Sequence, residues 1–378
     1  MSHFTVTVCL DDSSGHLARA IAIAQQDASP GGFLYQVIGQ RVGTALAPFD
    51  ENTEVTPRRD YEDGDPEDHW LIGSIRRGAE SHRQLTGQGA EALARQRVLA
   101  RNTSFPLEEA TAMVTEHAAD WARDAQQAAT LPEHASWADV VRVHNERFGE
   151  EDRMYLDKDG RAYTMTTYNP ESKWDWWAIG GRWTGQFPYE REHAAVVITG
   201  KPGLMTKPAA NGTCDGGPLY ALDLDTMRAG AATRARVRYG KYREAVEGTP
   251  DALPWSVFRD NISEGSGYTA DQARAEYRSQ PRVRALDATG EFSSPFSGDP
   301  IAEFTVPEEV YAERARAGAV PGYATLTADG RWMAPGHMGW FGMSDDEEND
   351  RIGYLEAANA YIGSLPDSAW IISVDCHI

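Results

Sequence analysis

A tryptophan-rich segment constrains this chain more than any other feature of its sequence. The segment covers residues 168–185 and reads YNPESKWDWWAIGGRWTG. Four tryptophans fall within ten positions: Trp174, Trp176, Trp177 and Trp183. Charged side chains of both signs stand between and around them. A buried indole N–H needs a hydrogen-bond partner, so a plain apolar core does not interleave tryptophan with charge. The pattern favours a rigid aromatic surface that orients a flat, polar or charged ligand.

We predict a ligand site in this segment. Trp176 or Trp177 would stack on a nucleobase, an interaction worth about 1–3 kcal/mol. Arg182 would bind a phosphate or carboxylate in bidentate fashion, with Lys173 as a second cation and Asp175 as a polar neighbour. The alternative is structural: the rings pack a domain junction, and Asp175 pairs with Lys173 or Arg182.

The two ends of the chain form a second candidate site. Residues 3–10 (HFTVTVCL) and 370–378 (WIISVDCHI) have patterns typical of strands, and we expect them to pair in a central sheet. Pairing would bring His3 near Asp375 or His377, because opposed Cβ atoms lie about 4.5–5.5 Å apart. Side chains alternate along a strand, so Asp375 and His377 share one face.

Three chemistries and one structural role fit these terminal residues. His3, Asp375 and His377 would bind a divalent metal such as zinc, or they would act as an acid and base pair. Cys376 faces the other way and would be a nucleophile only with an activating neighbour. The structural alternative is a hydrogen-bonded strand edge that fixes the terminus.

A glycine-rich loop at residues 335–342 (PGHMGWFG) adds two candidates, His337 and Trp340. Its three glycines allow close approach to a ligand. His337 would be a general base or a ligand, with a structural histidine as the alternative, and Trp340 would extend the aromatic surface. Gly180-Gly181 is expected to form a turn, since no phosphate-binding glycine motif is present.

The order of predicted elements favours an α+β fold. We expect a central, mainly antiparallel sheet with the N- and C-terminal strands paired and helices on its flanks. One elaborated domain would be built from residues 1–10, 45–70, 136–200 and 320–378, with a helical insertion at 75–134 and a loop-rich, helical subdomain at 201–300. Among the local predictions are a helix at 107–129, a helix at 137–148 capped by Ser136, a hairpin turn at 157–160, a strand at 194–198 and Asp225 as a helix N-cap.

Charge and composition limit the classes of molecule that this protein is expected to bind. The chain has 57 acidic and 36 basic residues, a net charge of −21, which opposes binding to a nucleic-acid backbone. The negative charge either keeps the protein soluble or forms a surface that binds a basic partner protein. Acidic residues are concentrated in two runs, at 60–68 and 345–350. Without an apolar run of about 18 residues or a basic signal-peptide start, we expect no membrane association. Three cysteines without CxxC spacing fit the cytoplasm.

Five short segments, each present once, follow one another along the chain in a fixed order. They are MSHFTV at the start, LAPFDENTEV at 46–55, the tryptophan-rich segment, GHMGWFG at 336–342 and VDCHI at the end. As a set they resemble a family of uncharacterised proteins encoded mainly by tailed bacteriophages and prophages. The family has no assigned activity, so the resemblance implies a phage or prophage origin and a location in the host cytoplasm. Residues 11–44 and about 75–134 look like insertions, which implies that the site residues lie in the shared segments.

These observations predict a protein that binds or acts on a small phosphorylated or nucleotide-like ligand. The site would form where the tryptophan-rich segment, the 336–342 loop and the paired termini meet. The alternative is a non-enzymatic acidic protein that binds a basic host protein and inhibits a host defence or nucleic-acid enzyme. The sequence is compatible with an enzyme and with a non-catalytic binding protein.

Overall fold

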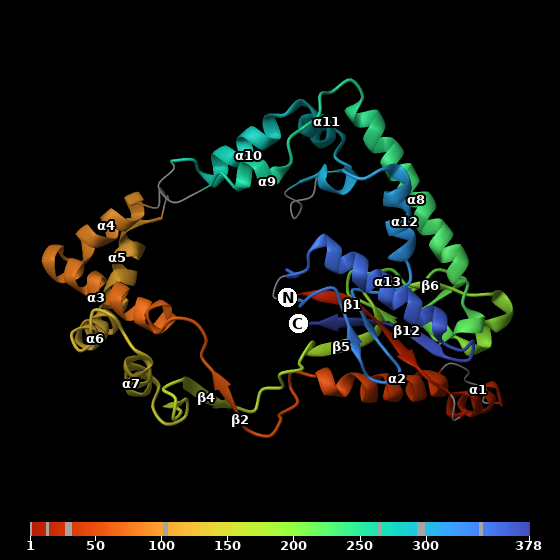
Figure 1. Cartoon of the computed structure of the whole chain (residues 1–378), viewed down its shortest axis with the longest axis horizontal. Helices are drawn as coiled ribbons and strands as arrows, with labels where there is room; N and C mark the ends of the chain where they lie inside the picture. The colour runs from red at the N-terminus through yellow and green to blue at the C-terminus, as the bar shows by residue number, and fades with distance from the viewer. Residues whose placement is uncertain are drawn as a thin grey trace. The chain divides into compact units, whose positions relative to one another are not determined.

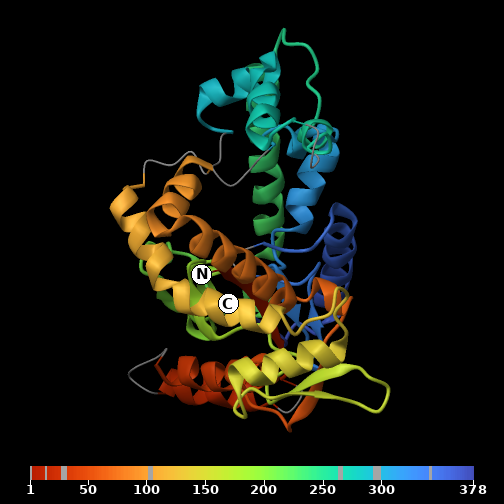
Figure 2. The same cartoon turned by 90° about the vertical axis from the view of Figure 1, so that its left-hand side faces the viewer.

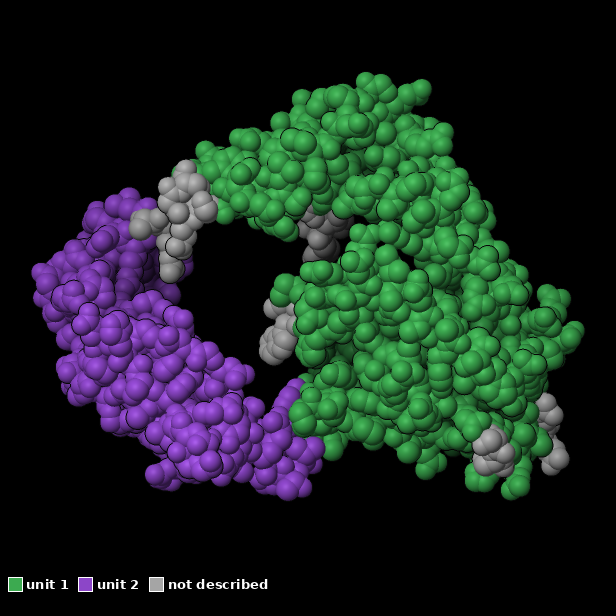
Figure 3. Space-filling view, viewed as in Figure 1, with its two compact units in different colours: residues 1–53, 169–378 green, residues 54–168 purple. Residues whose placement is uncertain are grey.

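The computed structural model describes residues 2–12, 15–26, 32–100, 105–262, 267–292, 299–339 and 343–378. The chain divides into two compact units (Figure 3). Unit 1 comprises Met1–Thr53 and Asn169–Ile378, and unit 2 comprises Glu54–Tyr168. Unit 2 is therefore inserted into the chain of unit 1. The segments 45–70 and 136–200, each expected within one domain, are each divided between the two units, and the 75–134 insertion lies within unit 2.

A seven-stranded mixed sheet forms the centre of unit 1, in the order β11-β10-β1-β12-β5-β7, with β9 also paired to β12. Its strands are β1 (His3–Leu10), β5 (Trp176–Gly181), β7 (Lys201–Pro202), β9 (Gly216–Pro218), β10 (Ala324–Leu326), β11 (Trp332–Met333) and β12 (Trp370–His377). β12 pairs antiparallel with β1, β5 and β9, while β1–β10 and β5–β7 are parallel. The α+β fold and the pairing of the terminal strands are confirmed.

β1 and β12 pair in register along their whole length, from His3 opposite His377 to Leu10 opposite Trp370. Ser2 and Ile378 exchange backbone hydrogen bonds of 3.1 and 3.0 Å, and the chain ends lie side by side in Figures 1 and 2. The alternation of side chains gives the paired strands one face that is apolar throughout. The opposite face has His3, Thr5, Asp375 and His377 at one end, for which we call it the polar face, while Cys9 and Ile371 at its other end belong to a further apolar cluster. His3 and His377 lie on the polar face.

The apolar face of this strand pair is part of the main core of unit 1. The strand residues in it are Phe4, Val6, Val8, Leu10, Trp370, Ile372, Val374 and Cys376. Helix α2 (Gly32–Leu46) packs there through Leu34, Ile38, Val42 and Leu46, which recur every four residues on one helix face. With Leu17 and Ala20 of α1 (His16–Gln26), this helix makes the described parts of segment 11–44 contribute to the core, although that segment was expected to be an insertion.

The rest of unit 1 is helical or built from short strands. Its helices are α8 (Leu224–Val246), α9 (Trp255–Arg259), α10 (Ala270–Ser279), α11 (Pro281–Thr289), α12 (Glu308–Ala317) and α13 (Glu348–Ser364). Its remaining elements are η1 (Ala47–Phe49), β6 (Phe187–Pro188), η3 (Arg191–Val196), β8 (Thr213–Cys214), η4 (Leu219–Ala221) and η5 (Ala302–Phe304). The strand predicted at 194–198 is thus wrong, since most of it lies in η3. Asp223, rather than Asp225, caps α8 by accepting from Thr226 N–H at 3.0 Å.

Unit 2 has its own cores and its own three-stranded sheet, in the order β2-β4-β3. Its elements are β2 (Arg58–Tyr61), η2 (Pro66–Asp68), α3 (Trp70–Gln88), α4 (Ala90–Ala100), α5 (Leu107–Glu116), α6 (Ala118–Ala128), α7 (Trp137–Phe148), β3 (Met154–Leu156) and β4 (Ala162–Thr166). The predicted helix 107–129 is two helices that meet at His117. The Ser136 cap of α7 and the 157–160 hairpin turn are confirmed.

Among the described residues, no helix combines the length and the apolar character needed to span a membrane.

Candidate functional site

Two histidine–carboxylate pairs meet on the polar face of the central sheet. His3 Nδ1 lies 2.8 Å from Asp375 Oδ1, and His377 Nδ1 lies 2.6 Å from Asp175 Oδ1. The two imidazole rings lie edge to face, with centroids 4.9 Å apart and planes at 76°. We call these four residues the two-dyad site. The sequence predicted that His3, Asp375 and His377 lie close together through strand pairing. It did not predict that Asp175 contacts His377.

Strand register brings the four residues together. His3 stands directly opposite His377, and Thr5 stands opposite Asp375, so His3 and Asp375 are diagonal neighbours on one face. On the other side of β12, His377 stands opposite Trp176 of β5. Asp175 precedes that strand, and its N–H donates to the His377 carbonyl at 2.9 Å. Three strands therefore meet at the site.

Asp375 is a buried positioning group rather than a surface ligand. Its side chain is 1% exposed, and its second oxygen, Oδ2, accepts the Arg182 backbone N–H at 2.9 Å. Both carboxylate oxygens are thus engaged. A buried carboxylate held in this way can orient His3 but has little room to contact a ligand itself.

The Gly180-Gly181 pair explains how the backbone reaches two buried carboxylates. Gly181 has φ +55°, and a Cβ at this position would overlap the Asp375 carboxylate. Gly180 has φ +79°, and its Cβ would come 2.6 Å from Asp215 Oδ2. Only glycine tolerates both the left-handed conformation and the close approach. The predicted turn is present, and its function is to deliver backbone N–H groups to carboxylates.

Among the described contacts, no hydrogen bond occupies the Nε2 atom of either imidazole. Because Nδ1 faces a carboxylate in both rings, the hydrogen bonding assigns the proton of the neutral form to Nδ1 and leaves the Nε2 lone pair for a proton or a ligand. The side chains of His3 and His377 are 17% and 15% exposed, so both rings reach the surface in part. This arrangement suits proton transfer to or from a bound molecule.

An aromatic surface adjoins the histidines. Trp176 is 50% exposed, and its ring centroid lies 6.1 Å from that of His3. Trp177 points to the opposite face of β5 and packs against the main core. Trp174 is buried there as well, with its indole N–H donating to the Leu46 carbonyl at 3.2 Å. Of the two tryptophans predicted to stack on a ligand, Trp176 is the one that shares a face with the histidines.

Segment 46–55 supports the tryptophan-rich segment and adds a residue that sequence reasoning missed. Glu51 donates its backbone N–H to the Trp174 carbonyl at 2.9 Å. Burial raises the pKa of the Glu51 carboxyl, and repulsion from Asp175 and Asp50 raises it further, while His377 partly offsets the rise. Glu51 therefore lies within the electrostatic field of the site. The sequence feature that could have identified Glu51 is its position in segment 46–55, one of the five segments on which the resemblance to phage proteins rests.

The two cations predicted to bind an anion, Lys173 and Arg182, lie in the tryptophan-rich segment, near Asp175 in the sequence. Lys173 is half-buried, and its backbone N–H donates to the Phe49 carbonyl at 2.8 Å. Arg182 is exposed, and within the described chain neither side chain forms an ion pair. The structural alternative in which Asp175 pairs with one of them is wrong, because Asp175 pairs with His377.

The glycine-rich loop contributes less to the described site. His337 is exposed, and its backbone N–H donates to Asp345 Oδ1 at 2.6 Å. Among the described contacts, none joins its ring to the two-dyad site. Trp340 lies outside the described residues, so its role stays a prediction.

The donor geometry favours proton transfer over metal binding at the termini. Among the described residues, one group of three side chains has ligand atoms within 4.8 Å of one another. It consists of Glu190, Glu192 and His193, at the start of η3. The predicted trio of His3, Asp375 and His377 forms no such group. Its carboxylate is already shared between an imidazole and a backbone N–H.

Cys376 does not have the surroundings of a nucleophile. It is fully buried in the main core, on the face opposite the histidines, and burial raises the pKa of its thiol well above the usual value. A thiol held in the neutral form does not attack a substrate. The catalytic alternative for Cys376 is therefore wrong.

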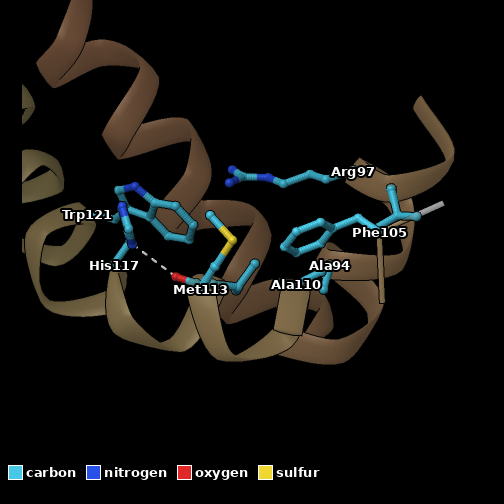
Figure 4. A pocket seen from close by; sticks show the side chains of 9 residues that line it. Ala94, Arg97, Phe105, Ala110, Met113, His117 and Trp121 are labelled. Carbon is cyan, nitrogen blue, oxygen red and sulfur yellow. Dashed lines mark hydrogen bonds between the residues drawn. The ribbon is translucent and has the colours of Figure 1, made fainter. Parts of the chain in front are cut away.

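Unit 2 contains an apolar hollow of about 380 Å³ that is separate from these residues (Figure 4). Residues that line it include Phe105, Met113, His117 and Trp121. The His117 Nδ1–H donates to the Met113 carbonyl at 3.0 Å, as the dashed line in Figure 4 marks. The hollow has none of the predicted site residues and offers no pair of groups for proton transfer.

The two acidic runs are used in part within the chain. In the first run, Asp65 accepts from Glu67 N–H at 2.9 Å, and Glu67 pairs with Arg76. In the second, Asp346 pairs with Arg351, and Asp345 binds the His337 backbone. These contacts give four of the acidic residues structural roles, and a basic partner protein stays a prediction.

Comparison with known protein families, with curated proteins and with solved structures finds no match to this chain. The resemblance to phage and prophage proteins therefore stays a prediction.

Proposed function

We propose that this protein binds and acts on a small phosphorylated or nucleotide-like ligand at the two-dyad site. The observation that carries the proposal is the pair of partly exposed imidazoles, each oriented by its own carboxylate, beside the half-exposed ring of Trp176. A phage or prophage origin, with action in the host cytoplasm, is proposed with it from the resemblance of the five short segments.

The chemistry of the dyads supports an active role. A carboxylate on Nδ1 holds an imidazole in one orientation and stabilises the imidazolium that forms when Nε2 takes up a proton. His3 and His377 would exchange protons with the ligand, while Asp375 and Asp175 would position them. Trp176 would stack on a flat ring of the ligand, and Arg182 or Lys173 would bind its anionic group.

The charge of the chain supports a small ligand. A protein with net charge −21 repels a long polyanion, whereas a mononucleotide requires only one or two local cations. Neither Lys173 nor Arg182 has an ion-pair partner among the described residues, so both are available for that purpose.

The test is mononucleotide binding by isothermal titration calorimetry, with Trp176→Ala as the variant. We expect the variant to weaken binding by about fivefold or more, because stacking on one aromatic ring is worth about 1–3 kcal/mol. Trp70→Ala is the matched control, since Trp70 is 59% exposed and lies in unit 2. Absence of nucleotide binding, or equal binding by both variants, would contradict the proposal.

A further inference from the structure

We propose that the two-dyad site cleaves a nucleoside phosphodiester, with His3 and His377 in opposite protonation states. One imidazole takes a proton from the attacking oxygen, and the other gives a proton to the leaving oxygen. This inference rests on the proposed function and adds to it the substrate class and the reaction.

The geometry places two proton-transfer groups side by side. The ring centroids are 4.9 Å apart, and each ring comes from a different strand. Each Nδ1 is occupied by a carboxylate, so the two Nε2 atoms are the reactive positions. General acid–base groups act at about 2.6–3.2 Å from the proton that they move, and two rings this close can both reach oxygens bound to a single phosphorus atom.

Cleavage requires one neutral imidazole as the base and one imidazolium as the acid. A carboxylate contacts each ring, Asp375 at His3 and Asp175 at His377. The Glu51 carboxyl also interacts electrostatically with His377. Carboxylates beside both rings can therefore balance the charge of an imidazolium on either histidine.

The charge balance at the rings favours cleavage of a diester over cleavage of a monoester. A phosphodiester carries one negative charge, which one imidazolium can balance. A phosphomonoester carries close to two, which one imidazolium leaves unbalanced. Transfer of a dianionic phosphoryl group also relies on clamps of several cations. The alkoxide that leaves a diester needs a proton, which the imidazolium supplies.

The reaction balances with water as the sole co-reactant. The neutral imidazole takes a proton from water at Nε2 as the water oxygen attacks phosphorus and forms a new P–O bond. The P–O bond to the leaving oxygen breaks, and the imidazolium Nε2–H protonates that oxygen. The two rings have then exchanged protonation states, and proton exchange with solvent restores them. Trp176, on the same face, would hold the base of the substrate.

The experiment measures hydrolysis of 2′,3′-cyclic AMP by the full chain, with product followed by chromatography and substrate binding measured separately. We expect turnover whose rate rises and then falls with pH. His3→Gln and His377→Gln should each lower kcat by about 100-fold or more, which is the usual worth of a proton-transfer group, while binding persists. His134→Gln, an exposed histidine in unit 2, should leave the rate unchanged.

The outcomes separate the inference from the function on which it rests. Nucleotide binding without turnover by the wild-type chain would overturn the inference and leave the proposed ligand class standing. Turnover that survives both histidine substitutions would also overturn it. Neither binding nor turnover would overturn both. Should a variant fail to fold, the pH profile of the wild-type chain decides, because a rate that does not fall on both sides argues against an acid and base pair.

Discussion

At the scale of single residues, Gly181 allows the backbone to approach the Asp375 carboxylate closely enough for the Arg182 N–H to bind it. It combines φ +55° with a Cβ position that overlaps the Asp375 carboxylate. We expect Gly181→Ala to lower the free energy of unfolding by about 3 kcal/mol or more, because strain and steric overlap add. The measurement is urea denaturation followed by circular dichroism.

Gly330→Ala is the matched control for this prediction. Gly330 has φ +85°, but nothing lies within 4 Å of its Cβ position, so the substitution costs only the left-handed conformation, about 1 kcal/mol. Equal losses in the two variants would mean that close approach to Asp375 is not what requires glycine at position 181.

The three thiols should be unreactive in the folded protein. Cys9, Cys214 and Cys376 are all buried, and burial raises the pKa of Cys9 and Cys214 to about 12 and that of Cys376 well above the usual range. Because the thiolate is the reactive form, a disulfide reagent at pH 8 should label none of them until urea is added. Rapid labelling of one thiol without denaturant would contradict this expectation.

At the scale of elements, helix α3 begins with an unusual cap. His69 precedes the helix, and its Nδ1 accepts the Leu71 backbone N–H at 3.3 Å, which requires a neutral imidazole. Burial lowers the pKa of His69, and His144 lowers it further, while Glu62 partly offsets the fall. Protonation would remove the acceptor and place positive charge at the positive end of the helix dipole.

The sign of this linkage predicts acid sensitivity in unit 2. A histidine whose pKa is lower in the folded state stabilises the fold above its unfolded pKa, near 6.5, and this stabilisation is lost as the pH falls below that value. We expect the free energy of unfolding to fall more steeply between pH 7.5 and 5.5 in the wild type than in His69→Asn. Asparagine keeps a capping acceptor but does not titrate in this range. Parallel pH dependences would rule out His69 as the cause.

At the scale of the whole molecule, unit 2 is an insertion whose two ends are joined by hydrogen bonds. Val55 N–H donates to the Thr167 carbonyl at 2.9 Å, and β2 pairs with β4 from Arg58 opposite Thr166. Its cores consist of its own residues, such as Leu71 and Leu93. Such a unit can be removed without leaving a long gap in the remaining chain.

We therefore expect both units to fold separately. Residues 54–168 expressed alone should show a helical circular dichroism spectrum and cooperative thermal unfolding. Unit 1 with residues 56–166 replaced by a short Gly/Ser linker should also unfold cooperatively, because its sheet and main core lie outside the deleted residues. A gradual, non-cooperative transition in either protein would show that it depends on the other.

Local patterns predicted many of the elements because the forces that form them act between near neighbours. The alternation in residues 3–10 and 370–378 predicted two strands, and the His-to-His register follows from their pairing. Ser136 accepts from the Asp139 N–H within one turn, so its cap was visible in the sequence. The break at His117 and the wrong strand at 194–198 show where local propensity alone did not predict the structure.

The sequence by itself determined the α+β class, the paired termini and the residue types of the site, since alternation and capping are written in short stretches of chain. Tertiary structure alone decided which carboxylate joins which histidine. It placed Asp175 on His377 across 202 positions, turned Trp177 into the core and used Gly181 to reach Asp375. These contacts depend on distances between segments far apart in the chain, and such distances exist only once three strands and the turn after β5 have assembled.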